Sequence, residues 1–255
     1  MNYWRKITAV TACAAAVLIA VPAQSADLVV WGGGAVKSAL TDLMTDFQAT
    51  SGTKIVSEFA PMGPLIKKLK DNPAGADIVV LSAEVMADAI KSGLVADGSV
   101  TEVGRVGVGV AVNEKAPLPD ISTAADFKAT LLAAKSIVMV DPATGTSGKH
   151  LAEVFQKLGV AEEIKARTTL LPGGYVVELV GKGEIELGLH QITEILPVKG
   201  IKLVGPLPAE LQKVTIYQAG IATKATNPEG AKTFLTSLGT PKVRASIASK
   251  GFIVQ

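Results

Sequence analysis

The sequence has 255 residues, of which 48% are hydrophobic and 19% charged, an ordinary globular composition with enough chain for one large or two small α/β domains. Its formal net charge is +2 and no run of lysine and arginine exceeds two residues, which argues against nucleic acid or a membrane surface as a partner. Aromatic residues are scarce, whereas small and aliphatic residues are abundant, which favours parallel strands buried under helices.

Residues 1–26 have the pattern of an export signal. Arg5 and Lys6 form a positive n-region, an apolar h-region follows, and small residues mark a cleavage point near residues 23–26. The apolar run is too short for a stable membrane-spanning helix. We therefore expect export to the periplasm. The mature chain would contain no cysteine, because Cys13 lies in the signal, and this excludes disulfides and cysteine-based sites.

The first part of the mature chain repeats a unit of strand, turn and helix. Each unit begins with a short apolar run, continues through a turn and ends with apolar residues at helical spacing. The expected strands are residues 28–31, 54–59 and 77–81. The turn after the first strand contains Gly32, Gly33 and Gly34, and the turn after the second contains Met62 and Gly63. Such units build a sheet with helices packed against it.

A stretch that alternates glycine and valine, residues 103–112, predicts one long strand that crosses into a second lobe. The second lobe repeats the scheme, with strands expected at residues 136–140, 167–171 and 186–190. Another long strand, residues 214–223, is expected to return the chain to the first lobe, where two helices complete it.

This pattern predicts a two-lobed α/β fold with a cleft at the strand ends. Each lobe is expected to hold a mixed, mostly parallel sheet flanked by helices. The expected division is residues 27–108 and 220–255 for lobe I and residues 109–219 for lobe II.

A polar turn, residues 141–150, leads into a helix of the second lobe. The unpaired N–H groups of a first helical turn and the helix dipole favour an anion. Thr146, Ser147, Lys149 and His150 can add hydroxyl and cationic donors, and Ser147 can also cap the helix. The Walker spacing is absent, so a small anion or carboxylate fits better than ATP. Most strand-to-helix turns carry glycine and serine for geometry alone, so this turn needs support from elsewhere.

That support comes from four glycine-rich helix starts, at Gly33, Met62, Thr146 and Gly174, which are expected to converge from both lobes on an anion site. The candidate ligand-binding residues are Gly33, Gly34, Ala35, Met62, Gly63, Thr146, Ser147, Gly148, Lys149, His150, Gly174, Tyr175, His190 and Gln191. No cofactor is expected. Two distant histidines without cysteine give no metal-binding motif.

Five stretches of the chain carry a family resemblance: the export signal, the turn at Gly32, residues 65–78, residues 82–84 and residues 250–252. Together they resemble periplasmic solute-binding proteins of the molybdate-binding type, and the match covers essentially the whole mature chain. The resemblance implies the type II periplasmic binding fold, closure of two lobes about a hinge, and delivery of an anionic solute to an ABC importer. We expect the protein to be a monomer.

The ligand residues depart from the pattern of that family. By spacing, Ala35 and Met62 stand where molybdate binders have serine hydroxyls, and Gln191, beside His190, stands where they have a tyrosine. Losing two charge-assisted hydrogen bonds, at ~1.5 to 3 kcal/mol each, argues against molybdate. The polar candidates that remain suit a longer organic anion with two or three carboxylates.

Two functions stay open at this point. The first is capture of such an anion for import, without catalysis. The second follows from a further resemblance, because some exported relatives of molybdate-binding proteins are aconitate isomerases, which move a proton and a double bond. In that reaction His150 or His190 would be the base. Each histidine also has an ordinary structural explanation, near a helix start or at a strand end.

Overall fold

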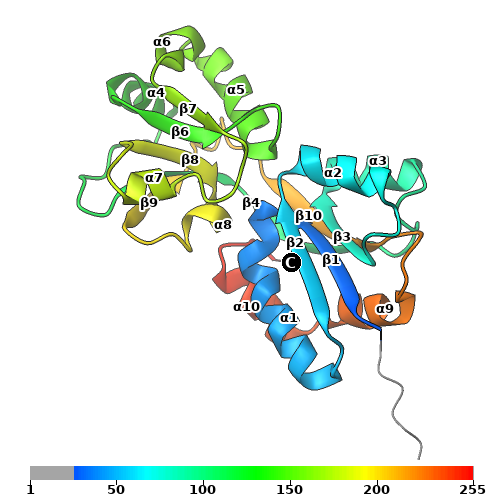
Figure 1. The fold of residues 1–255 in the computed structure, drawn as a ribbon. Coiled ribbons are helices and arrows are strands. Elements are labelled where there is room, and N and C mark those ends of the chain that lie inside the picture. The colour runs from blue at the N-terminus through cyan, green and yellow to red at the C-terminus, as the bar shows by residue number, and fades with distance from the viewer. Residues whose placement is uncertain (1–25, 255) are drawn as a thin grey trace, which may run out of the picture.

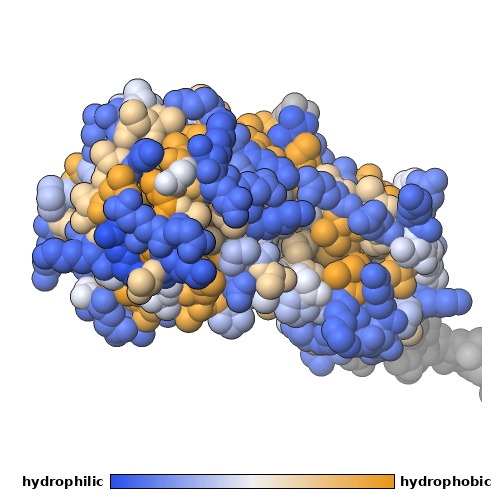
Figure 2. Space-filling view, turned by 90° about the horizontal axis from the view of Figure 1, so that it is seen from above, coloured by the Kyte–Doolittle hydropathy of each residue, from blue (hydrophilic) through white to orange (hydrophobic). Residues whose placement is uncertain are grey.

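The structure is a computed structural model that describes residues 26–254. It consists of two lobes, each built on a five-stranded sheet, and this confirms the predicted two-lobed α/β fold (Figure 1). The predicted export signal falls on residues outside the described range, apart from Ala26. None of the helices within that range combines the length and the apolar character that spanning a membrane requires. From above, hydrophilic side chains extend over both lobes, interspersed with smaller hydrophobic areas (Figure 2).

The sheet of the first lobe has the strand order β2-β1-β3-β10-β4. Its strands are β1 (Leu28–Gly33), β2 (Ile55–Ala60), β3 (Ile78–Ser82), β4 (Thr101–Val106) and β10 (Thr215–Ile221). Its helices are η1 (Gly34–Val36), α1 (Lys37–Ser51), α2 (Met62–Asp71), α3 (Ala83–Lys91), α9 (Pro228–Ser237) and α10 (Pro241–Ser249). Strand β1 is parallel to β2 and β3, whereas β10 is antiparallel to β3 and β4.

The sheet of the second lobe has the strand order β7-β6-β8-β5-β9. Its strands are β5 (Val108–Asn113), β6 (Ile137–Val140), β7 (Thr168–Leu171), β8 (Leu187–Gln191) and β9 (Ile201–Pro206). Its helices are α4 (Ala124–Ala133), α5 (Thr146–Leu158), α6 (Ala161–Lys165), α7 (Glu178–Gly181) and α8 (Ile192–Ile195). Strand β6 is parallel to β7 and β8, and β5 is antiparallel to β8 and β9, so both lobes share one mixed topology.

Two crossovers join the lobes. The long strand predicted over residues 103–112 is wrong, because β4 ends at Val106 and β5 begins at Val108, in different sheets. Gln212, on the segment that leads back to β10, hydrogen-bonds the backbone at this break. Its Nε2 donates to the carbonyl of Val108 at 2.8 Å, and its Oε1 accepts from the N–H of Val108 at 2.9 Å. All of β10 lies in the first sheet, so we propose that lobe II ends before Thr215 and not at residue 219.

Each lobe has its own hydrophobic core. Strand β6 shows how the second lobe is covered on both faces: Ile137 and Met139 pack into one cluster with α4 and α5, whereas Val138 and Val140 pack into another with α7 and α8. This alternation follows from the two-residue period of a strand. Burying each such side chain contributes about 1.5 to 3 kcal/mol, so both faces stabilise the sheet and hold its strand ends in place at the cleft.

Candidate functional site

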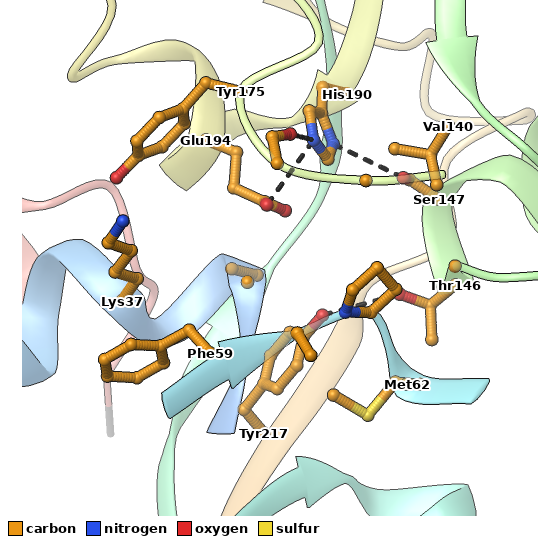
Figure 3. A pocket seen from close by; sticks show the side chains of 17 residues that line it. Lys37, Phe59, Met62, Val140, Thr146, Ser147, Tyr175, His190, Glu194 and Tyr217 are labelled. Carbon is orange, nitrogen blue, oxygen red and sulfur yellow. Dashed lines mark hydrogen bonds and ion pairs between the residues drawn. The ribbon is translucent and has the colours of Figure 1, made fainter. Parts of the chain in front are cut away.

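A cavity with a volume of about 110 Å³ lies between the two lobes, at the ends of their central strands. The first lobe contributes the turn at η1, the turn between β2 and α2, and Tyr217 of β10. The second lobe contributes the turn between β6 and α5, the loop after β7, and the end of β8 with α8. Figure 3 shows Lys37 and Tyr175 on one side of this cavity and Thr146 and Ser147 on the other.

Most of the predicted ligand-binding residues line this cavity. They are Gly34, Ala35, Met62, Thr146, Ser147, Gly174, Tyr175 and His190. Two more lie directly beside it. A Cβ added at Gly33 would collide with the end of the Met62 side chain. The N–H of Gly63 donates to the carbonyl of Thr144 at 3.1 Å and so joins the two lobes at the rim.

Lys149 and His150 do not line the cavity between the lobes. They border a neighbouring cavity of about 160 Å³ beside β10, and the Nε2 of His150 lies 2.8 Å from the carbonyl oxygen of Leu211. The reason is helical geometry. Successive residues are about 100° apart around a helix, so the start of α5 faces the cavity between the lobes while positions 149 and 150 face away.

The two other predicted residues have structural contacts instead. A Cβ at Gly148 would collide with the carbonyl oxygen of Val140, so glycine there lets α5 pack against β6. The Nε2 of Gln191 donates to Thr215 Oγ1 at 3.2 Å, across the lobe junction. These residues support the walls of the cavity without reaching its interior.

Three helix starts border the cavity, at η1, α2 and α5. Their N-cap residues are Gly33, Pro61 and Gly145, and none makes a side-chain capping hydrogen bond. The prediction that Ser147 caps α5 is therefore wrong, because Ser147 lies inside the first turn. Uncapped first-turn N–H groups, together with the helix dipole, favour an anion at this point, although in α2 the N–H of Gly63 is bonded to Thr144 and Pro64 has no N–H.

The prediction of a fourth helix start, at Gly174, is wrong as well. Gly174 lies in the loop between β7 and α7, with φ +78°, and α7 begins only at Glu178. Its carbonyl oxygen, and not its N–H, takes part in the site: it lies 3.0 Å from the Nε2 of His190.

A buried imidazole and a buried carboxyl lie side by side in the wall formed by β8 and α8 (Figure 3). His190 Nε2 is 3.4 Å from Glu194 Oε1. The Nδ1 of His190 accepts the N–H of Gln191 at 2.8 Å and lies 3.4 Å from Ser147 Oγ. Since Nδ1 accepts from the backbone and Nε2 faces the carbonyl of Gly174, the neutral imidazole carries its proton on Nε2.

Burial sets the protonation of this pair. It lowers the pKa of His190 to about 4 and raises the pKa of Glu194 to about 8, because the charged form of each group is poorly solvated inside the protein. At neutral pH the imidazole is therefore neutral and most of the carboxyl is protonated. Lys37 then brings the one formal charge to the cavity lining that the structure describes.

Lys37 Nζ lies 5.4 Å from the centre of the Tyr175 ring, a cation–π distance that spans the two lobes. It forms no ion pair with a carboxylate among residues 26–254, so its charge is available to a ligand. Opposite, the hydroxyl of Tyr217 lies 3.4 Å from Thr146 Oγ1. Burial raises the pKa of both tyrosines, so their hydroxyls stay protonated and can donate.

Sequence reasoning missed Lys37 and Tyr217 and gave Glu194 no role in the site. The sequence does contain a signal for Lys37: it is a cation three residues after the glycine turn that was expected at the anion site. Tyr217 reaches the cavity through the pairing of β10 with β3, which no local pattern specifies. Within the described part of the chain, no three His, Cys, Asp or Glu side chains gather in a way that would hold a metal ion.

Comparison with known proteins gives matches along the whole described chain. A model for the family described as bacterial extracellular solute-binding protein matches residues 28–253. The aconitate isomerase of a Pseudomonas species is 29% identical over 229 residues, which are 88% of this chain and 86% of that protein. The molybdate-binding protein ModA of Escherichia coli (strain K12) is 24% identical, with 99% of this chain and 98% of that protein covered.

Solved structures show the same fold. The periplasmic molybdate-binding protein of Azotobacter vinelandii superimposes with a TM-score of 0.77 at 19% identity, covering 90% of this chain and 100% of that one. The resemblance to the molybdate-binding type, first indicated by short stretches of sequence, is thereby confirmed for the fold and for most of the chain.

Proposed function

We propose that this chain, which belongs to the family of bacterial extracellular solute-binding proteins, captures a small organic anion with two or three carboxylates between its lobes. The observation that carries this proposal is the electrostatic character of the cavity. Uncapped helix starts and Lys37 supply positive potential, and the carboxyl of Glu194 is largely protonated at neutral pH. A carboxylate in this cavity would meet donors and little repulsion.

The placement of the donors favours an elongated ligand. Lys37 and Tyr175 lie at one side of the cavity, Thr146 and Ser147 lie at the other, and apolar Phe59 and Met62 lie below these two groups, one on each side (Figure 3). A compact tetrahedral oxyanion would need its donors around a single point. The carbon atoms between two carboxylates would instead pack on the apolar side chains of Phe59 and Met62.

We further propose that the protein acts in the periplasm as a monomer and delivers its ligand to an ABC importer. The family description supports an extracellular binding role. Closure of the lobes would remove the ligand from water, and the hydrogen bond from Gly63 to Thr144 already joins the lobes at the rim of the cavity.

A second candidate function is isomerisation of a tricarboxylate such as aconitate. Two observations favour it: the 29% identity to an aconitate isomerase, and a buried carboxyl of raised pKa at the cavity. The histidines expected to act as base do not suit that role. His150 faces another cavity, and both ring nitrogens of His190 are held by backbone groups.

Calorimetric titration with tricarballylate, a saturated tricarboxylate that has no double bond to move, tests binding apart from catalysis. Lys37→Gln should weaken binding by tenfold or more, because a charge-assisted hydrogen bond contributes about 1.5 to 3 kcal/mol and each 1.4 kcal/mol is a factor of ten. Lys149→Gln is the matched control, since it removes a lysine from the neighbouring cavity. Equal affinity of Lys37→Gln and wild type would remove Lys37 from the site.

A further inference from the structure

We propose that Glu194 is a catalytic residue that moves a proton between two carbon atoms of the bound carboxylate, with His190 as the residue that positions it. This inference rests on the proposed binding of a polycarboxylate and deepens the second candidate function, because it assigns the proton transfer to a residue. It concerns unsaturated ligands with a CH₂ group between a carboxylate and a carbon–carbon double bond.

The position of Glu194 is fixed by the fold. It lies on α8, directly after β8, and its side chain points into the cavity (Figure 3). A Cβ added at Gly34 would lie 2.5 Å from Glu194 Oε1, so the carboxyl occupies the space that a glycine leaves at the start of η1. The first lobe thus holds the carboxyl from one side and His190 of the second lobe holds it from the other.

The two carboxyl oxygens differ in their surroundings. Oε1 lies 3.4 Å from His190 Nε2, whose N–H is bonded to the carbonyl of Gly174. Oε2 is the oxygen farther from His190, and Glu194 lines the cavity. One oxygen is therefore packed between Gly34 and His190 while the carboxyl as a whole borders the cavity, an arrangement that suits a general acid–base residue.

The other titratable groups around Glu194 cannot replace it. They are His190 on β8, Tyr175 in the loop after β7, Tyr217 on β10 and Lys37 on α1. The imidazole is neutral and its Nδ1 is occupied by a backbone N–H, while burial raises the pKa of both tyrosines. Lys37 is a cation. Glu194, with a pKa of about 8, is left as the group that can both take and return a proton near physiological pH.

The proposed step balances without any further reactant. The ionised carboxylate of Glu194 removes one proton from the CH₂ group, so a C–H bond breaks and an O–H bond forms. The electron pair becomes the new double bond, and the former double bond delocalises onto the far carbon and its carboxylate. Glu194 then returns the proton to that carbon. The helix starts and Lys37 stabilise the charge that develops on the ligand carboxylates.

The test follows trans-aconitate by ¹H NMR in D₂O, with tricarballylate affinity measured on the same samples. Wild type should incorporate deuterium and shift the double bond faster than buffer. Glu194→Gln should lose both by ~100-fold or more, because it cannot carry a proton, and should still bind tricarballylate. Glu163→Gln, which removes an exposed carboxylate on α6, should behave as wild type.

Two results would overturn the proposal. One is exchange by Glu194→Gln at the wild-type rate. The other is wild-type protein that binds tricarballylate but exchanges no proton, which leaves the binding function standing and removes the catalytic one. A wild type that binds neither tricarboxylate would instead contradict the binding function itself, and the proton transfer with it.

The positioning role of His190 has its own readout. The exchange rate of wild type should rise with pH through a midpoint near 8, since the base must be ionised. His190→Asn should move that midpoint, because it replaces the buried imidazole that lies 3.4 Å from Oε1. A purely structural histidine would change the amount of folded protein and leave the midpoint in place, and that result would remove His190 from the proposal.

Discussion

At the scale of single residues, His190 and Glu194 titrate in opposite directions when they are buried. The folded protein holds Glu194 protonated up to about pH 8, whereas an ordinary glutamate ionises near its reference value of 4.5. His190 stays neutral in the folded protein down to about pH 4, whereas an exposed histidine takes up its proton near 6.5. Each difference makes the free energy of unfolding depend on pH.

The signs of the two effects predict where stability falls. Glu194 lowers stability as pH rises from 4.5 to 8, because the unfolded chain has lost a proton that the folded chain keeps. His190 raises stability from pH 4 to 6.5, because the unfolded chain then holds the extra proton. The two offset each other up to pH 6.5, and above it Glu194 acts alone.

We therefore expect the free energy of unfolding, measured by urea denaturation without ligand, to fall between pH 6.5 and 8 by on the order of 1 to 2 kcal/mol. Glu194→Gln should abolish this fall, since it removes the titrating group. Glu163→Gln should retain it. A fall of the same size in Glu194→Gln would show that another group is responsible.

The residue scale is also where prediction from sequence was least complete. Thr146, Ser147 and His190 could be placed at the cavity because they stand at strand ends or helix starts. Lys149 and His150 could not be excluded, because their direction depends on where α5 begins, and α5 begins without a side-chain cap. The pKa values of the buried pair depend on burial by both lobes, which a sequence does not contain.

At the scale of elements, the loop between β7 and α7 meets the start of α2. Gly173 has φ +147°, and a Cβ there would collide with Pro61 Cγ of the other lobe. The loop and α2 thus close over the cavity at a point where only glycine fits. Side chains seldom adopt such a φ, so backbone strain would accompany the collision.

Gly173→Ala should hold the lobes apart and weaken tricarballylate binding by tenfold or more, because closure is needed to complete the site. Gly183→Ala is the matched control: Gly183 also has a positive φ, +76°, but nothing lies within 4 Å of an added Cβ. Small-angle scattering should show a larger radius of gyration for Gly173→Ala alone. Identical scattering and affinity in the two variants would contradict a role for this contact.

The elements themselves were largely predictable, with one informative exception. Apolar runs and helical spacing located the short strands and most helices. The run of residues 103–112 was taken as one strand because its alternating pattern continues through Gly107. The break there depends on Gln212, which bonds both backbone groups of Val108 from more than a hundred positions away, and no local pattern reports such a contact.

At the scale of the whole molecule, two lobes of the same topology meet around one cavity. Among the contacts between the lobes are two hydrogen bonds to backbone carbonyls: the N–H of Gly63 donates to Thr144, and Ser38 Oγ donates to Thr193 at 3.5 Å. An ion pair joins Lys213 and Glu84 at 2.9 Å. Most of these contacts involve backbone atoms or exposed side chains, which contribute little individually. Opening would therefore break mainly weak contacts, together with the packing of Ile192 of α8 against the core of the first lobe.

The central claim is that this fold, shared with molybdate-binding proteins, holds a carboxylate ligand here. A thermal-shift panel tests it directly, because a ligand that binds the folded state raises the melting temperature. The mature protein would be heated with molybdate, sulfate, phosphate and a series of di- and tricarboxylates at equal concentration. We predict a rise with one or more of the carboxylates and none with molybdate. A large rise with molybdate alone would contradict the account and would show that Ala35 and Met62 do not exclude that anion.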